Sequence, residues 1–287
     1  MHAAQSTLDT STASLDLVLL YPGAIEGGSD QIIIDVLPQV VSRPQVAAWA
    51  FERTLDPVPV VALLLDVQAD ALSDIVDSCE DLLSSQVRDE PALAMQPLVE
   101  TPGRGRGQSD VPLGVRHSRI DSAGGAQNIR AKISLEQAIS TVAMSVLSNV
   151  RRRRWDRKTI APSLLTGLLD RLGQRDESAS AAYAVMQQIL AADPNAEALT
   201  RQFRMNAHKL GKLQVPVLLE GAPLEEFEAE TGAVLDALAA AVRAPTHAGE
   251  AVQRAMVWQR LAAGIGFAAV EAAYIACLAS SVERGRA

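Results

Sequence analysis

The 287-residue chain has a formal net charge of −8, with 34 acidic and 26 basic residues. This charge argues against general nucleic-acid binding, because neutralising phosphates requires a basic face. Hydrophobic residues at 48% and charged residues at 21% are typical of a globular protein with a substantial core. Aromatic residues are only 3% of the chain, so Ala and Leu must supply much of the packing, which favours a helix-rich fold.

The cysteines, Cys79 and Cys277, lie in amphipathic helical patterns and offer neither metal-ligand spacing nor a disulfide framework. A reducing cytoplasm is therefore the expected location. The first residues lack the basic and apolar regions of a signal peptide, and Glu271 interrupts the apolar stretch 264–280, so we expect no membrane association. The sequence has no Walker loop, Rossmann fingerprint or HExxH motif. We therefore expect neither a metal nor another cofactor.

The first half of the chain has an alternating strand and helix pattern. Residues 1–14 are expected to be a disordered lead-in. We predict strands over 15–20, 46–53 and 60–65, and helices over 29–41 and 70–84. The sequence Asp56-Pro57-Val58-Pro59 forces a turn between the second and third strands, because each proline fixes its own backbone. The order strand, helix, strand, strand, helix is typical of a ferredoxin-like unit.

Residues 86–126 are rich in Pro, Gly and polar side chains, and a loop of this length is usually functional or disordered. Within it His117, Arg119 and Ser122 offer a base, a cation and a hydroxyl, although a solvated loop explains the same composition. From Ser134 onward the pattern is helical, and Ser134 with Gln137 resembles a capping box that opens a helix. We therefore expect one α+β domain over 15–287. It consists of a small βαββα ferredoxin-like half (15–85), a functional loop (86–126) and a mainly helical half (127–287).

Arg53 is a lone cation on a strand of an otherwise apolar hairpin. An arginine presents a planar fork of donors, so Arg53 is a candidate to bind an anion or a peptide carbonyl. A salt bridge at the sheet edge explains the residue about equally well.

A dense group of cations covers residues 151–158, including Arg152, Arg153 and Arg154. Such a group can hold an acidic peptide or a phosphate. The alternative is a helix C-terminus that favours cations through its dipole. Further along the chain, Gln259 and Arg260 follow Trp258 in a helical pattern. If these polar side chains are buried, they either bind a substrate or join a core network, and the alternative is an exposed polar face.

Taken together, these pieces resemble the stand-alone relatives of the C-terminal domain of class I lanthipeptide dehydratases. The resemblance rests on Tyr21-Pro22, on the early helix, on the hairpin AFERTLDPVPVVALLLD and on the late VWQRL. The hairpin keeps the aromatic residue and the arginine of the family pattern as Phe51 and Arg53. The His and two Arg of the family's second strand are Val60, Ala62 and Leu64 in this chain. In the late element Arg260 is kept, Gln259 replaces an asparagine and Ala255 replaces a histidine.

Without those charged groups, the chain is more similar to the thiopeptide cyclases. The resemblance then implies a cofactor-independent enzyme that joins two dehydroalanines of a leader-bearing precursor peptide. The reaction is a formal aza-Diels–Alder cycloaddition that gives a six-membered nitrogen heterocycle and a macrocycle. The expected catalytic residues are Arg53, His117, Arg119, Ser122, Gln259 and Arg260. The expected substrate-binding residues are Tyr21, Phe51, Trp258, Arg152, Arg153 and Arg154.

The expected partner is the modified precursor peptide, and a homodimer or an assembly with other biosynthetic enzymes is left open. Two other functions are also left open, namely elimination of glutamate from glutamylated Ser and Thr, and non-catalytic binding of the precursor. The leaders of this family tend to be acidic, so the cationic group over 151–158 is expected to hold the leader. The alternative is that the early strand and helix bind the leader by strand addition.

Overall fold

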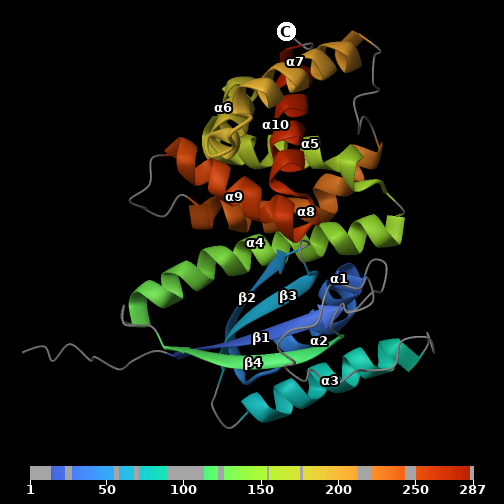
Figure 1. Cartoon of the computed structure of the whole chain (residues 1–287), viewed down its shortest axis with the longest axis vertical. Coiled ribbons are helices and arrows are strands. Elements are labelled where there is room, and N and C mark those ends of the chain that lie inside the picture. The colour runs from blue at the N-terminus through green and yellow to red at the C-terminus, as the bar shows by residue number, and fades with distance from the viewer. Residues whose placement is uncertain are drawn as a thin grey trace, which may run out of the picture.

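A four-stranded sheet and a stack of helices lie on opposite sides of one long helix, α4 (Figure 1). The computed structural model describes residues 14–22, 28–54, 58–67, 71–88, 113–121, 126–153, 155–174, 177–212, 222–242 and 250–284. Within these ranges the chain combines one antiparallel sheet with many helices, which confirms the expected α+β class.

The sheet has the strand order β2-β3-β1-β4, and every neighbouring pair is antiparallel. Its strands are β1 (Ser14–Pro22), β2 (Val46–Thr54), β3 (Val60–Val67) and β4 (Leu113–Asp121). The register aligns Arg53 with Val61 and Leu20, and both aliphatic side chains are fully buried. Side chains directly opposite each other share a face of the sheet. The Arg53 side chain therefore leaves the backbone on the buried face.

The expected loop 86–126 was wrong for residues 113–121, because these residues form strand β4. In the described part of the chain, β4 is an edge strand that pairs with β1 alone over its whole length. An edge strand tolerates polar and charged side chains, so the polar composition of this segment hid its structure. Residues 89–112 of the expected loop lie outside the described residues.

The buried face of the sheet is covered by helices from the first half of the chain. A continuous helical stretch is made of α1 (Gly28–Gln31), the π-helical η1 (Ile32–Val36) and α2 (Leu37–Val41). Helix α3 (Leu72–Arg88) contacts β1, β4 and η1, and it buries Ile75, Cys79 and Leu83. This spacing of four residues places the three side chains on one side of the helix, as the amphipathic pattern predicts.

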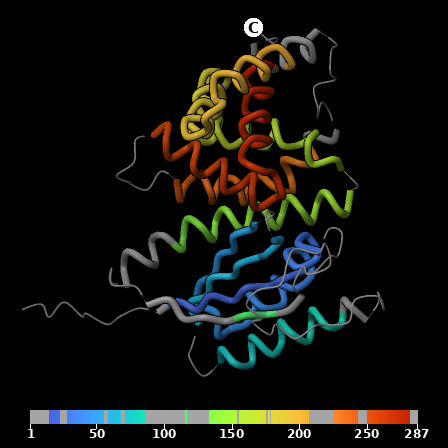
Figure 2. The backbone as a smooth tube through the Cα atoms, viewed as in Figure 1, coloured from blue at the N-terminus to red at the C-terminus, as the bar shows by residue number. Residues whose placement is uncertain are grey.

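Helix α4 (Ala126–Arg153) packs against the β2 edge on one side and against α8 and α9 on the other. The remaining helices are α5 (Arg157–Leu169), η2 (Asp170–Gln174), α6 (Ser178–Leu190), α7 (Ala196–Lys212), α8 (Ala222–Val242), α9 (Glu250–Gly264) and α10 (Ala269–Arg284). Figure 2 shows α10 running beside α6 and α7, and it also contacts α5 and α9.

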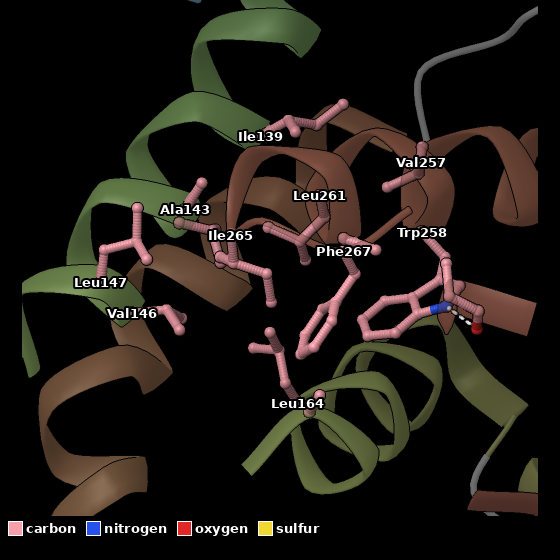
Figure 3. Close-up of a cluster of buried hydrophobic side chains, with 14 of the residues drawn as sticks. Ile139, Ala143, Val146, Leu147, Leu164, Val257, Trp258, Leu261, Ile265 and Phe267 are labelled. Carbon is pink, nitrogen blue, oxygen red and sulfur yellow. Dashed lines mark hydrogen bonds between the residues drawn. The ribbon is translucent and has the colours of Figure 1, made fainter. Parts of the chain in front are cut away.

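The core of the helical half is formed where α4, α5 and α9 meet (Figure 3). Leu164, Leu261 and Ile265 are fully buried there, and Phe267 packs against them. Trp258 is also fully buried, and its indole N–H donates a hydrogen bond to the carbonyl oxygen of Ala272 at 3.0 Å. The core therefore ties α9 to α4, α5 and α10.

Among the described helices, none alone has the length and apolar character needed to cross a membrane. By length and composition only, the bent pair of α9 and 269–281 passes that test, with an angle of 116° between its parts.

Candidate functional site

A pocket of about 410 Å³ lies where β2, α4 and α9 meet. Its volume is within the range of pockets that bind small ligands or short peptide segments. Four residues predicted from the sequence line it, namely Phe51, Arg53, Gln259 and Arg260. The full lining is Phe51, Glu52, Arg53, Thr54, Glu136, Ile139, Met256, Gln259, Arg260, Ala263 and Gly264. The fold therefore brings the hairpin motif and the late helical motif to one place.

Arg260 joins the three elements that surround the pocket. Its Nη1 atom lies 2.8 Å from a carboxylate oxygen of Glu52 on β2 and 2.7 Å from one of Glu136 on α4. The Glu136 side chain is largely buried, whereas Glu52 is exposed. Sequence reasoning missed both glutamates, because a carboxylate on a strand edge or a helix face has no local signature. Only the fold shows that they share a cation.

Gln259 and Met256 present the α9 side of the pocket, and both side chains are exposed. A glutamine amide carries both donors and an acceptor, so it can bind a peptide bond in either direction. Beside these groups, Phe51 and Ile139 supply an apolar wall. The arrangement suits an uncharged peptide segment held by a small number of hydrogen bonds.

Arg53 lines this pocket, and its side chain forms a buried ion pair. Its Nη1 atom is 2.6 Å from a carboxylate oxygen of Asp30 on α1, and only 7% of the Arg53 side chain is exposed. Arg157 of α5 pairs with the same carboxylate and donates to the carbonyl oxygen of Ile265 at 2.9 Å. Burial lowers the pKa of Arg53 while the Asp30 carboxylate raises it, and a guanidinium remains protonated under such conditions. The side chain thus forms the salt bridge that the sequence left as an alternative.

One nitrogen atom of Arg53 takes no part in these interactions. Its Nε is buried and has no hydrogen-bond partner among the described residues. A buried donor without a partner costs free energy, and functional sites are places where such costs are found.

The turn after α9 brings backbone against this ion pair. The Gly266 N–H bonds to the Ala263 carbonyl at 2.9 Å, and the Phe267 N–H bonds to the Ala262 carbonyl at 2.8 Å. This pair of bonds is the Schellman motif, which requires a left-handed residue, and Gly266 has a φ of 97°. A β-carbon at Gly266 would lie only 2.6 Å from the Nη1 atom of Arg157. Glycine is therefore needed for its conformation and for its lack of a side chain.

The structure places two predicted substrate-binding residues away from the pocket. Tyr21 follows the buried Leu20 on β1, so it lies on the opposite face of the sheet from Arg53. The guanidinium carbon of Arg116 is 5.9 Å from the centre of the Tyr21 ring. Trp258 is fully buried in the core of the helical half and does not line the pocket. Its position is that of a packing residue.

His117 and Arg119 lie on β4, opposite Val18 and Asp16 of β1. Two strands separate β4 from β2, so the two edges of the sheet are roughly 14 Å apart. The fold therefore does not bring these two positions next to the β2 edge, where the pocket lies. Ser122 lies outside the described residues.

The cationic group at the end of α4 is surrounded by carboxylates. Arg153 pairs with Glu230 at 3.0 Å and with Glu226 at 3.4 Å, and Arg152 also contacts Glu230. The hydrogen bond from Arg153 lowers the pKa of Glu230. The other pairs are Arg151 with Asp35, Arg157 with Asp30 and Lys158 with Glu271. Arg154 lies outside the described residues. Each described cation of the group thus has an acidic partner, which reduces its attraction for an external anion.

The alternative mode of leader binding needs a correction. In the described sheet β1 lies between β3 and β4 and is paired on both sides. The early strand therefore has no open edge there to which a leader could be added.

The fold is the feature by which this chain is similar to known proteins. The chain has the fold of a thiopeptide pyridine synthase and of part of a lantibiotic dehydratase, which confirms the resemblance found in the sequence. No family model matches the chain, and no curated protein sequence matches it.

Three solved structures illustrate the likeness. The first is the pyridine synthase TbtD from thiomuracin biosynthesis, with 12% identity and a TM-score of 0.60 over 96% of this chain and 100% of that chain. The second is the tRNA-dependent lantibiotic dehydratase MibB from Microbispora sp. 107891, with 15% identity and a TM-score of 0.54. The match covers 95% of this chain and 28% of the dehydratase. The third is TsrL, with 11% identity and a TM-score of 0.53 over 96% of each chain. At these identities the likeness shows the fold alone.

Proposed function

We propose that this protein modifies a ribosomally made peptide and closes a six-membered nitrogen ring between two of its dehydroalanines. The observation that carries the proposal is the pocket in which Gln259 and Arg260 face the β2 edge. The fold adds support, because the likeness to a pyridine synthase extends over nearly the whole of both chains. In the dehydratase, the corresponding match covers only about a quarter of the protein.

The reaction makes modest demands on a protein. The amide of one dehydroalanine must pass its N–H proton to its carbonyl oxygen, which produces a 2-azadiene. The double bond of the second dehydroalanine then adds across this diene, so that two carbon–carbon bonds form and no atom is lost. Loss of water from the adduct gives a dihydropyridine, and elimination of the leader as an amide then gives a pyridine. Hydrogen-bond donors and one proton-transfer group are sufficient for the first step.

The residues of the pocket fit these demands. The Gln259 amide and the Arg260 guanidinium are the donors available to hold the reacting carbonyl oxygen. Glu136 lies beside Arg260 and is the carboxylate we assign to moving the amide proton. The remaining task is to hold two ends of one peptide together, which can contribute roughly 7–11 kcal/mol to lowering the barrier. The apolar wall formed by Phe51 and Ile139 supplies that surface.

An assay with a linear, dehydroalanine-containing precursor that carries its leader tests the proposal. Mass spectrometry with fragmentation would then show a cyclic product that has lost water, or water and the leader. A glutamylated precursor in a parallel reaction tests the elimination alternative, which would release glutamate and leave the chain linear. A precursor that binds tightly without any change in mass would indicate a non-catalytic scaffold.

A further inference from the structure

Strand β2 forms one edge of the described sheet. The Ser140 side chain of α4 occupies that edge at Phe51. The Phe51 N–H donates to the Ser140 hydroxyl oxygen at 2.9 Å, and the hydroxyl donates to the Phe51 carbonyl oxygen at 3.4 Å. Both interactions are buried. The backbone polar groups of Phe51 therefore point away from β3 and toward α4.

The direction of the Phe51 groups sets the direction of those of Arg53. In an antiparallel pair, residues alternate between those that bond to the partner strand and those that point away from it. Phe51 lies opposite Leu63 and Arg53 lies opposite Val61, with no register shift between them. The N–H and carbonyl of Arg53 thus also point away from β3. These two backbone groups face the side of β2 on which the pocket lies, and four successive β2 residues line that pocket.

We propose that the Arg53 backbone is a subsite for one residue of an extended peptide. The N–H of Arg53 donates to the carbonyl of that residue, and the carbonyl of Arg53 accepts its N–H. The identity of the peptide as the dehydroalanine-containing precursor rests on the proposed function. The pairing itself is a binding property that depends on β2 and α4 and not on the chemistry of the ring.

The surroundings of Arg53 favour a peptide over other occupants. A donor and an acceptor on one strand residue match the groups of a peptide residue, which is the basis of recognition by strand addition. Ser140 closes the edge at Phe51, so the ladder cannot extend in that direction. A second copy of this chain would need a longer open edge to pair through its own β2. A peptide bound at one residue can instead turn into the pocket toward Gln259 and Arg260.

Amide hydrogen exchange gives a direct test on the whole protein. Selective 15N labelling of arginine and phenylalanine makes the Arg53 and Phe51 amides observable by NMR, and Arg53→Lys identifies the Arg53 signal. On saturation with the linear precursor, exchange at Arg53 should slow by about three- to ten-fold, as expected for one added hydrogen bond. Exchange at Phe51 should stay unchanged, because Ser140 already accepts from that amide.

The binding of N-methylated peptides supplies an independent measurement. N-methylation of the one paired residue should weaken binding by a similar factor, and N-methylation several residues away should have no such effect. Unchanged exchange at Arg53, or an absence of binding, would overturn the subsite. Slow exchange that depends on protein concentration without peptide would also overturn it, because a second copy would then occupy the edge. Slowed exchange at Arg53 without ring formation would support the subsite and overturn the proposed cyclisation. Ring formation with unchanged exchange at Arg53 would support the cyclisation and overturn the subsite.

Discussion

Gly266 and Arg53 lie so close that a β-carbon on the glycine would be 2.9 Å from the Nη1 atom of the arginine. Real β-carbons essentially never approach another atom this closely, so a side chain at 266 must displace the buried ion pair. The contact joins the turn after α9 to the hairpin strand β2. It therefore ties the helical half of the protein to its sheet.

Gly266→Ala should destabilise the protein more than Gly173→Ala. Both glycines have a positive φ, so either substitution costs roughly 1–2 kcal/mol in backbone strain. No atom of the described residues lies within 4 Å of a β-carbon at Gly173, whereas the one at Gly266 must also move Arg53 and Arg157. We expect an added loss of about 1–3 kcal/mol in the free energy of unfolding from this overpacking. Urea denaturation of the two variants measures their losses in the free energy of unfolding. Equal losses would contradict the close approach of Gly266 to Arg53 and Arg157.

Trp258→Phe should lower stability without changing the affinity for a peptide. The substitution removes the buried hydrogen bond to Ala272, which corresponds to about 1–3 kcal/mol in the free energy of unfolding. Trp155 is only partly buried, and Trp155→Phe is the matched control with a smaller expected loss. A Trp258→Phe protein that is fully stable but binds precursor poorly would return Trp258 to the substrate-binding role predicted from the sequence.

The thiols of Cys79 and Cys277 should be unreactive in the folded protein, because both are buried. Burial raises the pKa of Cys79 to about 11, so little thiolate is present even at mildly alkaline pH. A colorimetric thiol reagent should therefore modify both residues only after denaturation. An introduced thiol in Ser85→Cys, at an exposed position on α3, should react at once and serves as the positive control. Rapid modification of native Cys79 would contradict its burial.

The ion pairs between α4 and α8 should make stability depend on acid pH. The hydrogen bond from Arg153 lowers the pKa of Glu230 below its ordinary value of 4.5. A carboxylate with a lowered pKa in the folded state stabilises the protein above that ordinary value, and the contribution is lost as pH falls through the folded pKa.

Glu230→Gln should therefore be less stable than the wild type at neutral pH, and the difference should shrink in strongly acid solution. Urea denaturation midpoints of both proteins across this range measure the effect. A difference that stays constant with pH would show that Glu230 contributes by packing and not by its charge.

Local patterns predicted most of the fold. The helices and the β2–β3 hairpin have strong periodicity, and Pro, Gly and Asp mark their ends. Strand β4 was missed because an edge strand bonded on one side does not need an apolar pattern. Helix α4 also begins at Ala126, before the capping sequence at Ser134 from which the helix was expected to start.

The candidate site was predicted less completely. Gln259, Arg260, Phe51 and Arg53 were selected from short motifs, and the fold gathers them at one pocket. The carboxylates that hold the arginines, namely Asp30, Glu52 and Glu136, come from other elements and carry no local signal. Pairing between distant side chains depends on the tertiary fold, so sequence reasoning found the cations but not their partners.

Ring formation in the pocket that Gln259 lines is the central activity proposed for this protein. Gln259 is exposed on α9, so Gln259→Ala should leave the free energy of unfolding nearly unchanged. Gln187→Ala, at an exposed position on α6 outside the pocket lining, is the matched control.

The decisive measurement is the rate at which these proteins convert the linear precursor into a cyclic product, followed by mass spectrometry. We expect the wild type and Gln187→Ala to close the ring at equal rates. Loss of the donor in Gln259→Ala should slow closure by roughly a hundred-fold. A wild-type protein that forms no ring, or a Gln259→Ala protein as fast as the wild type, would contradict the account.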